Sequence, residues 1–448
     1  MVSQPHCRPL SLEEGTPIDD QSIVSLSLPR KVLLGIEPEQ QSDSDSLSDI
    51  HSYFHLGVAE DHNDEVSARL NRYILPPLSP NDEAGYAAAG CGTKETTLII
   101  LASFWFSDAY EGTSTTGESV WAQSVISALN YHGYAYMFST LGLYNPNMSR
   151  TSAIQRRYRR NTRLVLADPE QIEGCWYGEE QECLRTEDNP NGIEAWRLLS
   201  FWYWDNPRHP FGGSFTLSPF PHNDNYFLPL SIEFTCRRFP YIAPSLRPRP
   251  PQAYLLAKQI HYLDSSPEFV WTIPALVDLE HEFGISVVAG MVNDDEETAT
   301  AVQTAGLQNL GQLGKTDFYK ELANSFVLIG VGRPKISPSP WDGLCMGLPF
   351  INPVVEWDEN DSDNRTKWVT QQWHMTDLEP PYVYSVKAHD LHGLRAAVHG
   401  ALTHPINSYI PENMSFKFVT ARLTEVIDGD WRGKAEKVLN ERLKVGHN

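Results

Sequence analysis

The chain has 448 residues, of which 41% are hydrophobic and 11% aromatic, enough apolar material for the cores of two or three domains. Its 57 acidic and 35 basic residues give a formal net charge of -22, which argues against a nucleic acid or an anionic membrane surface as a partner. Six widely spaced cysteines without a Cys-x-x-Cys pair make a zinc site improbable and leave disulfide pairing open.

The N-terminal residues 1–92 show no regular hydrophobic pattern. Positions 32–68 contain no Lys or Arg and carry Ser/Asp repeats such as QSDSDSLSD. Such a segment cannot bury enough apolar surface to offset the entropy lost on ordering, so we expect 1–92 to be disordered. Neither a signal peptide nor a membrane anchor is visible. The longest apolar run, 98–106, is about half of the roughly 20 residues that a bilayer span requires.

After this segment, short apolar runs alternate with a helix-period segment, as is typical of a parallel sheet covered on both faces. This pattern predicts a Rossmann-like domain over 93–240. Irregular, aromatic-rich structure is expected over 170–215, where prolines and glycines interrupt the pattern. The expected strands lie at 96–106, 134–140 and 162–168, and the expected helix at 117–133.

A Pro/Arg-rich stretch, 241–252, precedes a second alternating pattern. We interpret the stretch as a linker and 241–448 as a second Rossmann-like domain. Its expected strands and helices lie at 253–263, 269–283, 285–290, 315–325, 326–332, 348–353 and 381–387.

The segment FVLIGVGRPKISPSPWDGLCMGLPFINP, residues 326–353, predicts a central strand, a Gly/Pro-rich loop, a short helix and a second strand. Ligands of open α/β sheets bind beyond the carboxyl ends of strands, and helix N-termini offer N–H groups to anions. The loop is therefore well placed for a phosphorylated ligand. By its spacing alone, it is more often only a turn.

Residues 331–353 resemble the donor-loop motif of glycosyltransferase family 18, whose members include alpha-1,6-mannosyl-glycoprotein 6-beta-N-acetylglucosaminyltransferases. Three further stretches agree with the family in the same order, namely TTGESVWAQSVISALNYHGY, SPFPHNDNYFLPLSIE and YLLAKQIHYL. The resemblance spans about 95 to 425. It implies a GT-B type fold, α/β with two Rossmann-like domains facing a cleft, in which the C-terminal domain holds most of the nucleotide sugar.

The resemblance also implies inverting transfer of N-acetylglucosamine from UDP-GlcNAc to a glycan or glycoprotein acceptor, with a beta-1,6 linkage to mannose. No cofactor and no metal are expected, and no Asp-x-Asp motif stands at a predicted strand end. The family works in the Golgi behind a membrane anchor. Because no anchor is visible here, either a preceding region is missing or the protein works in the cytoplasm.

The Gly-Glu motif of the family matches Glu118, which we predict to be the catalytic base; its alternative role is an acidic residue at a helix N-terminus. Asp342 matches a ribose-binding position at which the family carries Glu, and its alternative is a helix N-terminal residue. Ile336 occupies the place of a second acidic loop residue, which leaves the donor sugar open. Lys258 is predicted to contact the diphosphate, and Glu233 to contact either Lys258 or a donor hydroxyl.

The remaining predicted positions each have a structural alternative. Arg333 and Lys335 add positive charge to the loop and are either phosphate contacts or exposed side chains. Substrate contacts are predicted for His222, Trp202 and Trp204, against the alternatives of a turn histidine and core aromatics. The donor-binding set from the loop is Gly332, Arg333, Pro338, Pro340 and Asp342.

Two other functions remain open from the sequence. The first is a transferase of the same fold that uses another nucleotide sugar, which the loss of a loop carboxylate at Ile336 permits. The second is a catalytically silent member that binds a glycan or a nucleotide. The Gly-Glu motif at Glu118 argues against the silent alternative.

Overall fold

The computed structural model describes residues 47–71, 94–112, 114, 116–141, 147–178, 183–221, 224–264 and 269–445. The chain divides into two compact units, here called unit 1 (1–230 with 417–448) and unit 2 (231–416). The predicted boundary at 240/241 is therefore ten residues too late. The C-terminal tail was also wrongly assigned to the second domain.

Unit 1 is built on a six-stranded sheet in the order β2-β1-β3-β4-β5-β6. Every neighbouring pair in this sheet is parallel, and the register places Leu98 opposite Ala135. The sheet confirms the predicted α/β class for the first domain. Its strands are β1 Leu98–Leu101, β2 Ala135–Phe138, β3 Thr162–Ala167, β4 Leu198–Phe201, β5 Thr216–Ser218 and β6 Tyr226–Phe227.

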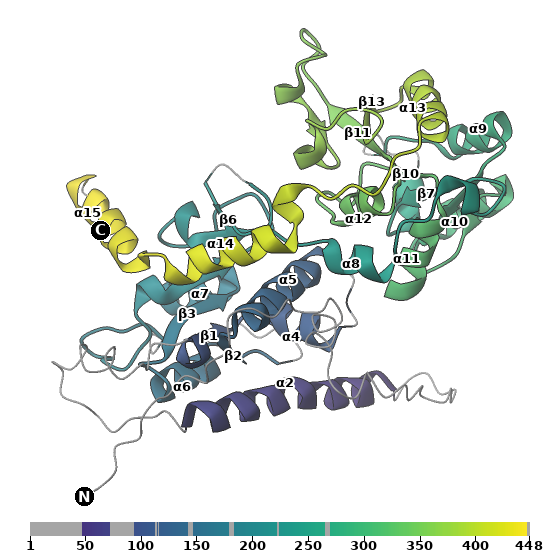
Figure 1. Cartoon of the computed structure of the whole chain (residues 1–448). Coiled ribbons are helices and arrows are strands. Elements are labelled where there is room, and N and C mark those ends of the chain that lie inside the picture. The colour runs from purple at the N-terminus through teal and green to yellow at the C-terminus, as the bar shows by residue number, and fades with distance from the viewer. Residues whose placement is uncertain are drawn as a thin grey trace, which may run out of the picture. The chain divides into compact units, whose positions relative to one another are not determined.

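Helices connect and flank these strands (Figure 1). The predicted strand 96–106 is too long, because it ends at Leu101 and the following apolar residues form a helix. The region 170–215 is more regular than predicted, since it contains most of α7 and all of β4. The helices are α2 Leu47–Asn71, α4 Phe104–Glu111, α5 Gly117–His132, α6 Ser149–Arg157, α7 Pro169–Tyr177, α14 Phe416–Asp428 and α15 Trp431–Val445.

Helix α2 contradicts the prediction that all of 1–92 is disordered; residues 1–46 and 72–92 lie outside the described residues. Val66 and Leu70 are buried in the core against β1, β2 and β3. The buried side-chain amide of Asn63 donates to the carbonyl of Phe138 and accepts from its N–H, both at 2.8 Å. Asn63 thus pairs with β2 at the edge of the sheet, where unpaired backbone groups would otherwise remain.

The C-terminal tail belongs to unit 1 because its carbonyl groups are bound there. The guanidinium group of Arg163 in β3 donates to the carbonyls of Ile427, at 2.7 Å, and Gly429, at 2.9 Å. Arg422 of α14 donates to the carbonyl of Phe227 at 2.9 Å. A periodic pattern reveals that α14 is a helix but does not reveal which domain it packs on.

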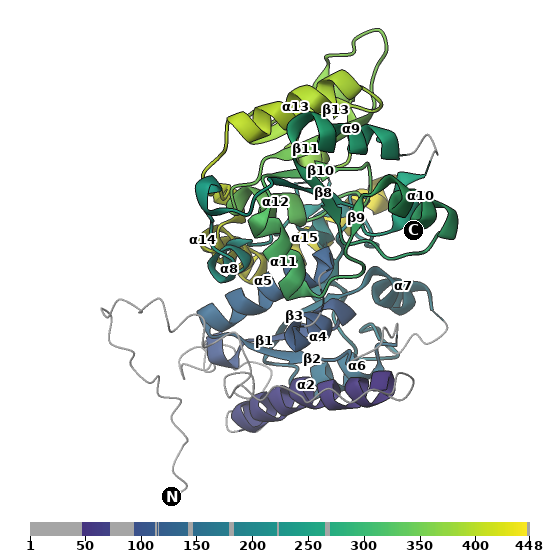
Figure 2. The same ribbon diagram turned by 90° about the vertical axis from the view of Figure 1, so that its right-hand side faces the viewer.

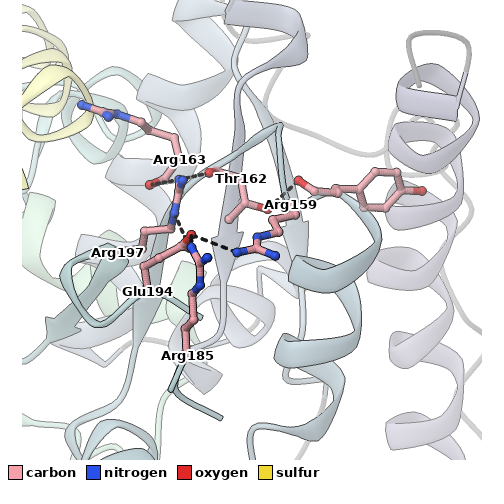
Figure 3. Close-up of polar contacts among 7 residues, drawn as sticks. Arg159, Thr162, Arg163, Arg185, Glu194 and Arg197 are labelled. Atoms are coloured by element: carbon pink, nitrogen blue, oxygen red, sulfur yellow. Dashed lines mark hydrogen bonds and ion pairs between the residues drawn. The ribbon is translucent and has the colours of Figure 1, made fainter. Parts of the chain in front are cut away.

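One carboxylate gathers three guanidinium groups at the amino ends of β3 and β4 (Figure 3). Glu194 lies 2.9 Å from Arg197, 3.1 Å from Arg185 and 3.6 Å from Arg159. Burial opposes the ionised form of Glu194, but the charge of Arg197 and its neighbours outweighs burial and lowers the pKa. Arg197 also donates to the carbonyl of Thr162. This cluster stabilises the amino edge of the sheet.

Unit 2 contains a second sheet, in which β13, β11, β10, β7, β8 and β9 are neighbours and all parallel, while β12 pairs antiparallel with β11. With the first sheet, it confirms the predicted fold class of two Rossmann-like α/β domains. The strands are β7 Gln252–Leu256, β8 Ser286–Ala289, β9 Gln308–Asn309, β10 Val327–Gly330, β11 Phe350–Glu356, β12 Val369–Thr370 and β13 Val383–Lys387.

Helices cover both faces of this sheet (Figure 2). On one face, Leu276 and Leu394 belong to the same core as Leu255 of β7. On the other face, Phe318 packs on Tyr254 with ring centroids 5.7 Å apart. The first face carries α9 Ile273–Phe283, α10 Glu296–Ala305 and α13 Leu391–Thr403, and the second carries α11 Lys315–Asn324 and α12 Ser339–Cys345.

The Pro/Arg-rich stretch 241–252 is not a linker between the units but part of unit 2. Its Arg247 is only 3% exposed and donates to the carbonyls of Ser325, Met346 and Gly347. Burial lowers the pKa of this guanidinium group to about 10. The buried charge is stabilised by carbonyls at helix C-termini, where the helix dipole favours a cation.

Two disulfides answer the question that the cysteine spacing left open. Cys175 is bonded to Cys183, and Cys236 of α8, Glu233–Arg238, is bonded to Cys345 of α12. The second bond fixes the first helix of unit 2 to the helix that follows the Gly/Pro-rich loop. Cys7 and Cys91 lie outside the described residues.

Replacing Asn63 by Ala should lower the free energy of unfolding by about 2 kcal/mol, because two buried backbone groups of Phe138 lose their partners. Urea unfolding of the full chain measures this change. Asp64→Ala, at an exposed position of the same helix, is the matched control and should change little. Equal stability of both variants would contradict a stabilising role of α2.

Candidate functional site

The strand order of unit 2 reverses between β7 and β10. Counted along the chain, the six parallel strands lie in the order 3-2-1-4-5-6, which is the order of dinucleotide-binding sheets. Ligands of such sheets bind beyond the carboxyl ends of the two strands where the order reverses. Leu256 and Gly330 are paired at these ends, and Lys258 and Gly332 each follow two residues later. The structure thus brings together two of the predicted donor-binding residues.

The loop between β10 and α12 is held in shape by two successive glutamines. The side chain of Gln371 accepts from the N–H of Gly332 at 3.0 Å and donates to the carbonyl of Pro334 at 3.2 Å. Gln372 accepts from the N–H of Ser337 at 2.9 Å. Both glutamines are fully buried. This role could not be predicted from the sequence, because the glutamines follow the loop by more than 30 residues and lie in no motif.

The shape of this loop changes one expectation. We expected the start of α12 to offer N–H groups to an anion. Instead, the N–H of Ser339 is bonded to the Ser337 side chain, and those of Trp341 and Asp342 are bonded to the carbonyl of Pro338. Prolines at 334, 338 and 340 have no N–H. Positive charge at this edge therefore comes from side chains, of which Lys258, Arg333 and Lys335 are exposed.

Asp342 does not face a ligand. Its carboxyl group is fully buried in α12 and accepts from the hydroxyl of Tyr319 at 3.2 Å. Burial raises the pKa of Asp342 to about 7, although hydrogen bonds from Tyr319 and Thr235 and the charge of Lys315 act in the opposite direction. The predicted ribose contact of Asp342 is therefore wrong in this structure, because no ribose hydroxyl can reach a carboxyl group inside the core.

Glu233 and Lys258 do not pair. Glu233 begins α8, where it accepts from the N–H of Phe416 at 2.9 Å and lies 3.4 Å from Arg237. No ion pair of Lys258 is present in the described part of the chain, and the lysine is exposed beyond the end of β7. Its carbonyl accepts from the N–H of Val292, which aligns the two segments that follow β7 and β8. Lys258 is thus available to an anion, whereas Glu233 serves the local structure.

A histidine and an aspartate missed by the sequence analysis lie at the same edge. His261, in the 3-10 helix Ile260–Leu263 after β7, places Nδ1 2.5 Å from a carboxylate oxygen of Asp294. The His261 N–H donates to the other oxygen of Asp294 at 3.3 Å. Burial would raise the pKa of Asp294, but the hydrogen bonds from the imidazole and from the backbone N–H of His261 together lower it. No sequence pattern joined the two residues, which are brought together only by the pairing of β7 with β8.

In unit 1, the predicted base Glu118 lies half-buried in the first turn of α5. The preceding Gly117 has no room for a side chain, since a Cβ would lie 2.4 Å from the hydroxyl oxygen of Tyr203. The cap residue Thr116 accepts from the N–H of Ser119 at 3.2 Å, and Asp108 of α4 accepts from the Ser119 hydroxyl. The contact with Tyr203 places the start of α5, and thus Glu118, over the carboxyl end of β4.

A carboxyl group with a raised pKa ends the neighbouring helix α4. Burial and the charge of Asp108 raise the pKa of Glu111 to about 7. A carboxyl group with this pKa is suited to proton transfer at neutral pH. Glu111 lies in no sequence motif, and its raised pKa depends on burial that only the folded chain provides.

The predicted aromatic contacts fall on the segment after β4. Trp204 is 37% exposed and Trp202 is half-buried, with its Nε1 donating to Asn206 at 3.0 Å. Tyr203, which lies between them in the chain, is buried against Phe220. Trp202 and Trp204 stay predictions as sugar contacts. His222 lies outside the described residues.

The described residues contain no group of three or more His, Cys, Asp or Glu side chains that could hold a metal ion. In the same residues, no helix is long and apolar enough to cross a membrane.

The buried carboxyl of Asp342 makes stability depend on pH. With a pKa near 7 when folded and about 3.9 when unfolded, the folded state retains a proton between these values that the unfolded state has lost. The free energy of unfolding therefore falls as the pH rises from about 4 to 7. Asp342→Asn cannot titrate, so its stability relative to the native chain should improve by roughly 2 kcal/mol between pH 5 and pH 8.

Urea unfolding at both pH values measures this change, with the exposed Asp317→Asn as control. UDP affinity should be the same in Asp342→Asn as in the native chain. A folded Asp342→Asn variant with clearly weaker UDP binding would restore the ribose contact.

The model of glycosyltransferase family 18 matches residues 214–431, and a comparison with curated proteins finds no match. Similar solved structures include AviGT4, a glycosyltransferase involved in avilamycin A biosynthesis, with 10% identity, a TM-score of 0.42, and coverage of 78% of this chain and 98% of that chain. A putative UDP-N-acetylglucosamine 2-epimerase from Listeria monocytogenes has 9% identity and a TM-score of 0.42, with coverage of 76% of this chain and 97% of that chain. A glycosyltransferase from Rickettsia africae ESF-5 has 10% identity and a TM-score of 0.39, with coverage of 78% of this chain and 97% of that chain.

The matched residues contain the whole of unit 2, with its reversed strand order and its loop. Residues 214–431 therefore form a glycosyltransferase family 18 domain, and the protein is a glycosyltransferase.

Proposed function

We propose that the protein transfers N-acetylglucosamine from UDP-GlcNAc to a sugar hydroxyl of a glycan or glycoprotein, with inversion at the anomeric carbon. Following the family resemblance, the acceptor is mannose and the new linkage is beta-1,6. The observation that carries the proposal is the position of Lys258 and Arg333, two exposed cations beyond the paired ends of β7 and β10.

In this proposal unit 2 binds the donor. A departing UDP develops negative charge on the β-phosphate oxygen, and a fixed positive charge stabilises that transition state. The N–H groups of Gly332, Ser337 and Ser339 are already bonded within the protein. We therefore assign the positive charge to Lys258 and Arg333. Lys335 is the third cation of the same edge.

Unit 1 supplies the base. The acceptor oxygen forms a bond to the anomeric carbon while the bond from that carbon to the β-phosphate oxygen breaks. The bonding electron pair leaves with UDP, and the acceptor proton moves to the carboxylate of Glu118. Gly117 and the cap residue Thr116 fix the turn that carries this carboxylate. Trp204 is the exposed aromatic ring proposed to stack on a sugar.

Two alternatives make different predictions. A transferase for another sugar would bind UDP but hydrolyse or transfer from a different UDP-, GDP- or dTDP-sugar. Ile336 is hydrophobic at a position where the family carries an acidic residue, which is compatible with a different donor sugar. A silent member would bind a nucleotide or glycan and release no product from any donor. A donor-hydrolysis assay over these nucleotide sugars distinguishes all three, and repeating it with EDTA tests independence of metal.

The disulfides bear on where the protein works. Disulfides persist in oxidising compartments and are rare in the cytosol, where thiols are kept reduced. Cys175–Cys183 and Cys236–Cys345 therefore favour the secretory pathway over the cytoplasmic alternative. A glycoprotein acceptor agrees with that compartment.

Glu118→Gln should lower the turnover of sugar transfer by about 10²-fold or more, because it removes the base and keeps the shape of the side chain. UDP binding should be nearly unchanged. Glu111→Gln is the matched variant at the second carboxyl group of the same helix pair, and it should keep most of the activity. If Glu111→Gln loses the activity and Glu118→Gln keeps it, the base is Glu111.

Lys258→Ala should weaken UDP binding by about 1–3 kcal/mol, the range for a lost hydrogen bond to a charged group, and leave the melting temperature nearly unchanged because the lysine is exposed. Calorimetric titration with UDP measures the effect. Lys320→Ala, at an exposed position of α11, is the control. A Lys258→Ala variant that melts early yet binds UDP normally would show a structural role.

A further inference from the structure

His261 and Asp294 form a dyad at the donor edge of unit 2 that the proposed reaction has not used. The 2.5 Å contact occupies Nδ1 of the imidazole, and the second oxygen of Asp294 accepts from the His261 backbone. Both side chains are partly exposed, at 36% and 25%. In the part of the chain that the structure describes, Nε2 has no hydrogen-bond partner. The dyad therefore presents an oriented ring nitrogen to solvent.

The position of the dyad follows from the backbone. Val292 donates its N–H to the carbonyl of Lys258, and Ile260 donates its N–H to the carbonyl of Val292, each at 3.0 Å. These bonds extend the pairing of β7 with β8 beyond the strand ends. His261 lies three residues after Lys258 in the chain. The two hydrogen bonds place it directly beside the segment that carries Asp294. The dyad thus lies next to the two strand ends where the order of the sheet reverses.

Aromatic rings hold the imidazole at this edge. His261 packs edge-on against Tyr262, with centroids 4.7 Å apart, and against Phe269, with centroids 5.8 Å apart. The charge of Arg333, in the loop after β10, acts on the hydroxyl of Tyr262. The dyad, which follows β7, and Arg333, which follows β10, therefore both lie near Tyr262.

We propose that His261 binds the diphosphate of the donor through Nε2–H and that Asp294 is its positioning residue. The inference rests on the proposed function, because it needs a nucleotide diphosphate at this edge. The Asp294 carboxylate fixes the tautomer and the orientation of the ring. When the bond to the anomeric carbon breaks, its electron pair resides on the β-phosphate oxygen, and the imidazolium N–H stabilises that oxygen.

A purely structural dyad is the competing interpretation. In that case Asp294 would only connect two loops, and removal of His261 would lower stability without a selective effect on phosphate binding. The charged and titratable groups that face the ring are Asp294, Asp295, Tyr262 and, beyond the tyrosine, Arg333.

The experiment is calorimetric titration of the full chain with UDP-GlcNAc and with UMP, each at pH 6 and pH 8, without acceptor. The diphosphate of UDP-GlcNAc keeps a constant charge over this range, so a change in its affinity reports on the protein. The native chain should bind UDP-GlcNAc more tightly at pH 6 than at pH 8. His261→Ala should bind it about tenfold more weakly at pH 6, with the pH dependence reduced and UMP affinity within about twofold of native.

Asp294→Asn keeps the shape of the dyad. It is the second test of the proposal and replaces the first if His261→Ala does not fold. It should weaken UDP-GlcNAc binding, because the ring has lost the carboxylate that orients it. His281→Ala, at an exposed position of α9, is the control and should match the native chain. Native-like UDP-GlcNAc affinity of folded His261→Ala and Asp294→Asn at both pH values overturns this inference alone. Failure of the native chain to bind UDP-GlcNAc overturns it together with the proposed function.

Discussion

The parallel pairing of β7 with β10 is the constraint on which the functional edge of unit 2 depends. Because the chain enters the sheet at β7 and later returns to the other side of that strand, the connections after β7 and β10 leave toward opposite faces. The residues that reach the space beyond the ends of these strands are those just after each strand, which are Lys258 and His261 on one side and Arg333 on the other.

The loop at this edge leaves backbone N–H and carbonyl groups without partners from regular structure, and side chains from a distant segment bond to some of them. The loop after β10 contains two residues with positive φ, Gly332 at 92° and Ile336 at 55°, and cannot satisfy its own N–H and carbonyl groups by regular structure. Gln371 and Gln372 satisfy them from the chain that follows β12. A loop stabilised in this way keeps its shape without a ligand, but it leaves recognition of a diphosphate to charged side chains.

The sequence predicts those features that depend on local pattern. The strand at β10, the helix at α5 and the parallel class of both sheets follow from runs and periods of apolar residues, and the family motif locates Lys258 and Glu118. The features that it misses depend on contacts between distant segments. The burial of Asp342 needs Tyr319 from another helix, and the His261 dyad needs a residue from the next strand connection. Helix α2 was not predicted because acidic residues surround the few apolar residues that reach the core, which include Val66 and Leu70.

The loss of both loop carboxylates has a consequence for recognition of the donor. One is replaced by Ile336, and the other, Asp342, is held inside α12 by Tyr319, close to the disulfide at Cys345. A ribose bound at this edge would therefore meet no carboxylate from the loop. Its hydroxyls would have to bond to neutral groups or to the cations that also serve the phosphates. Binding energy at this edge then comes chiefly from charge on the diphosphate, so the affinity for nucleotides should depend more on phosphate number and salt than on the sugar of the nucleoside.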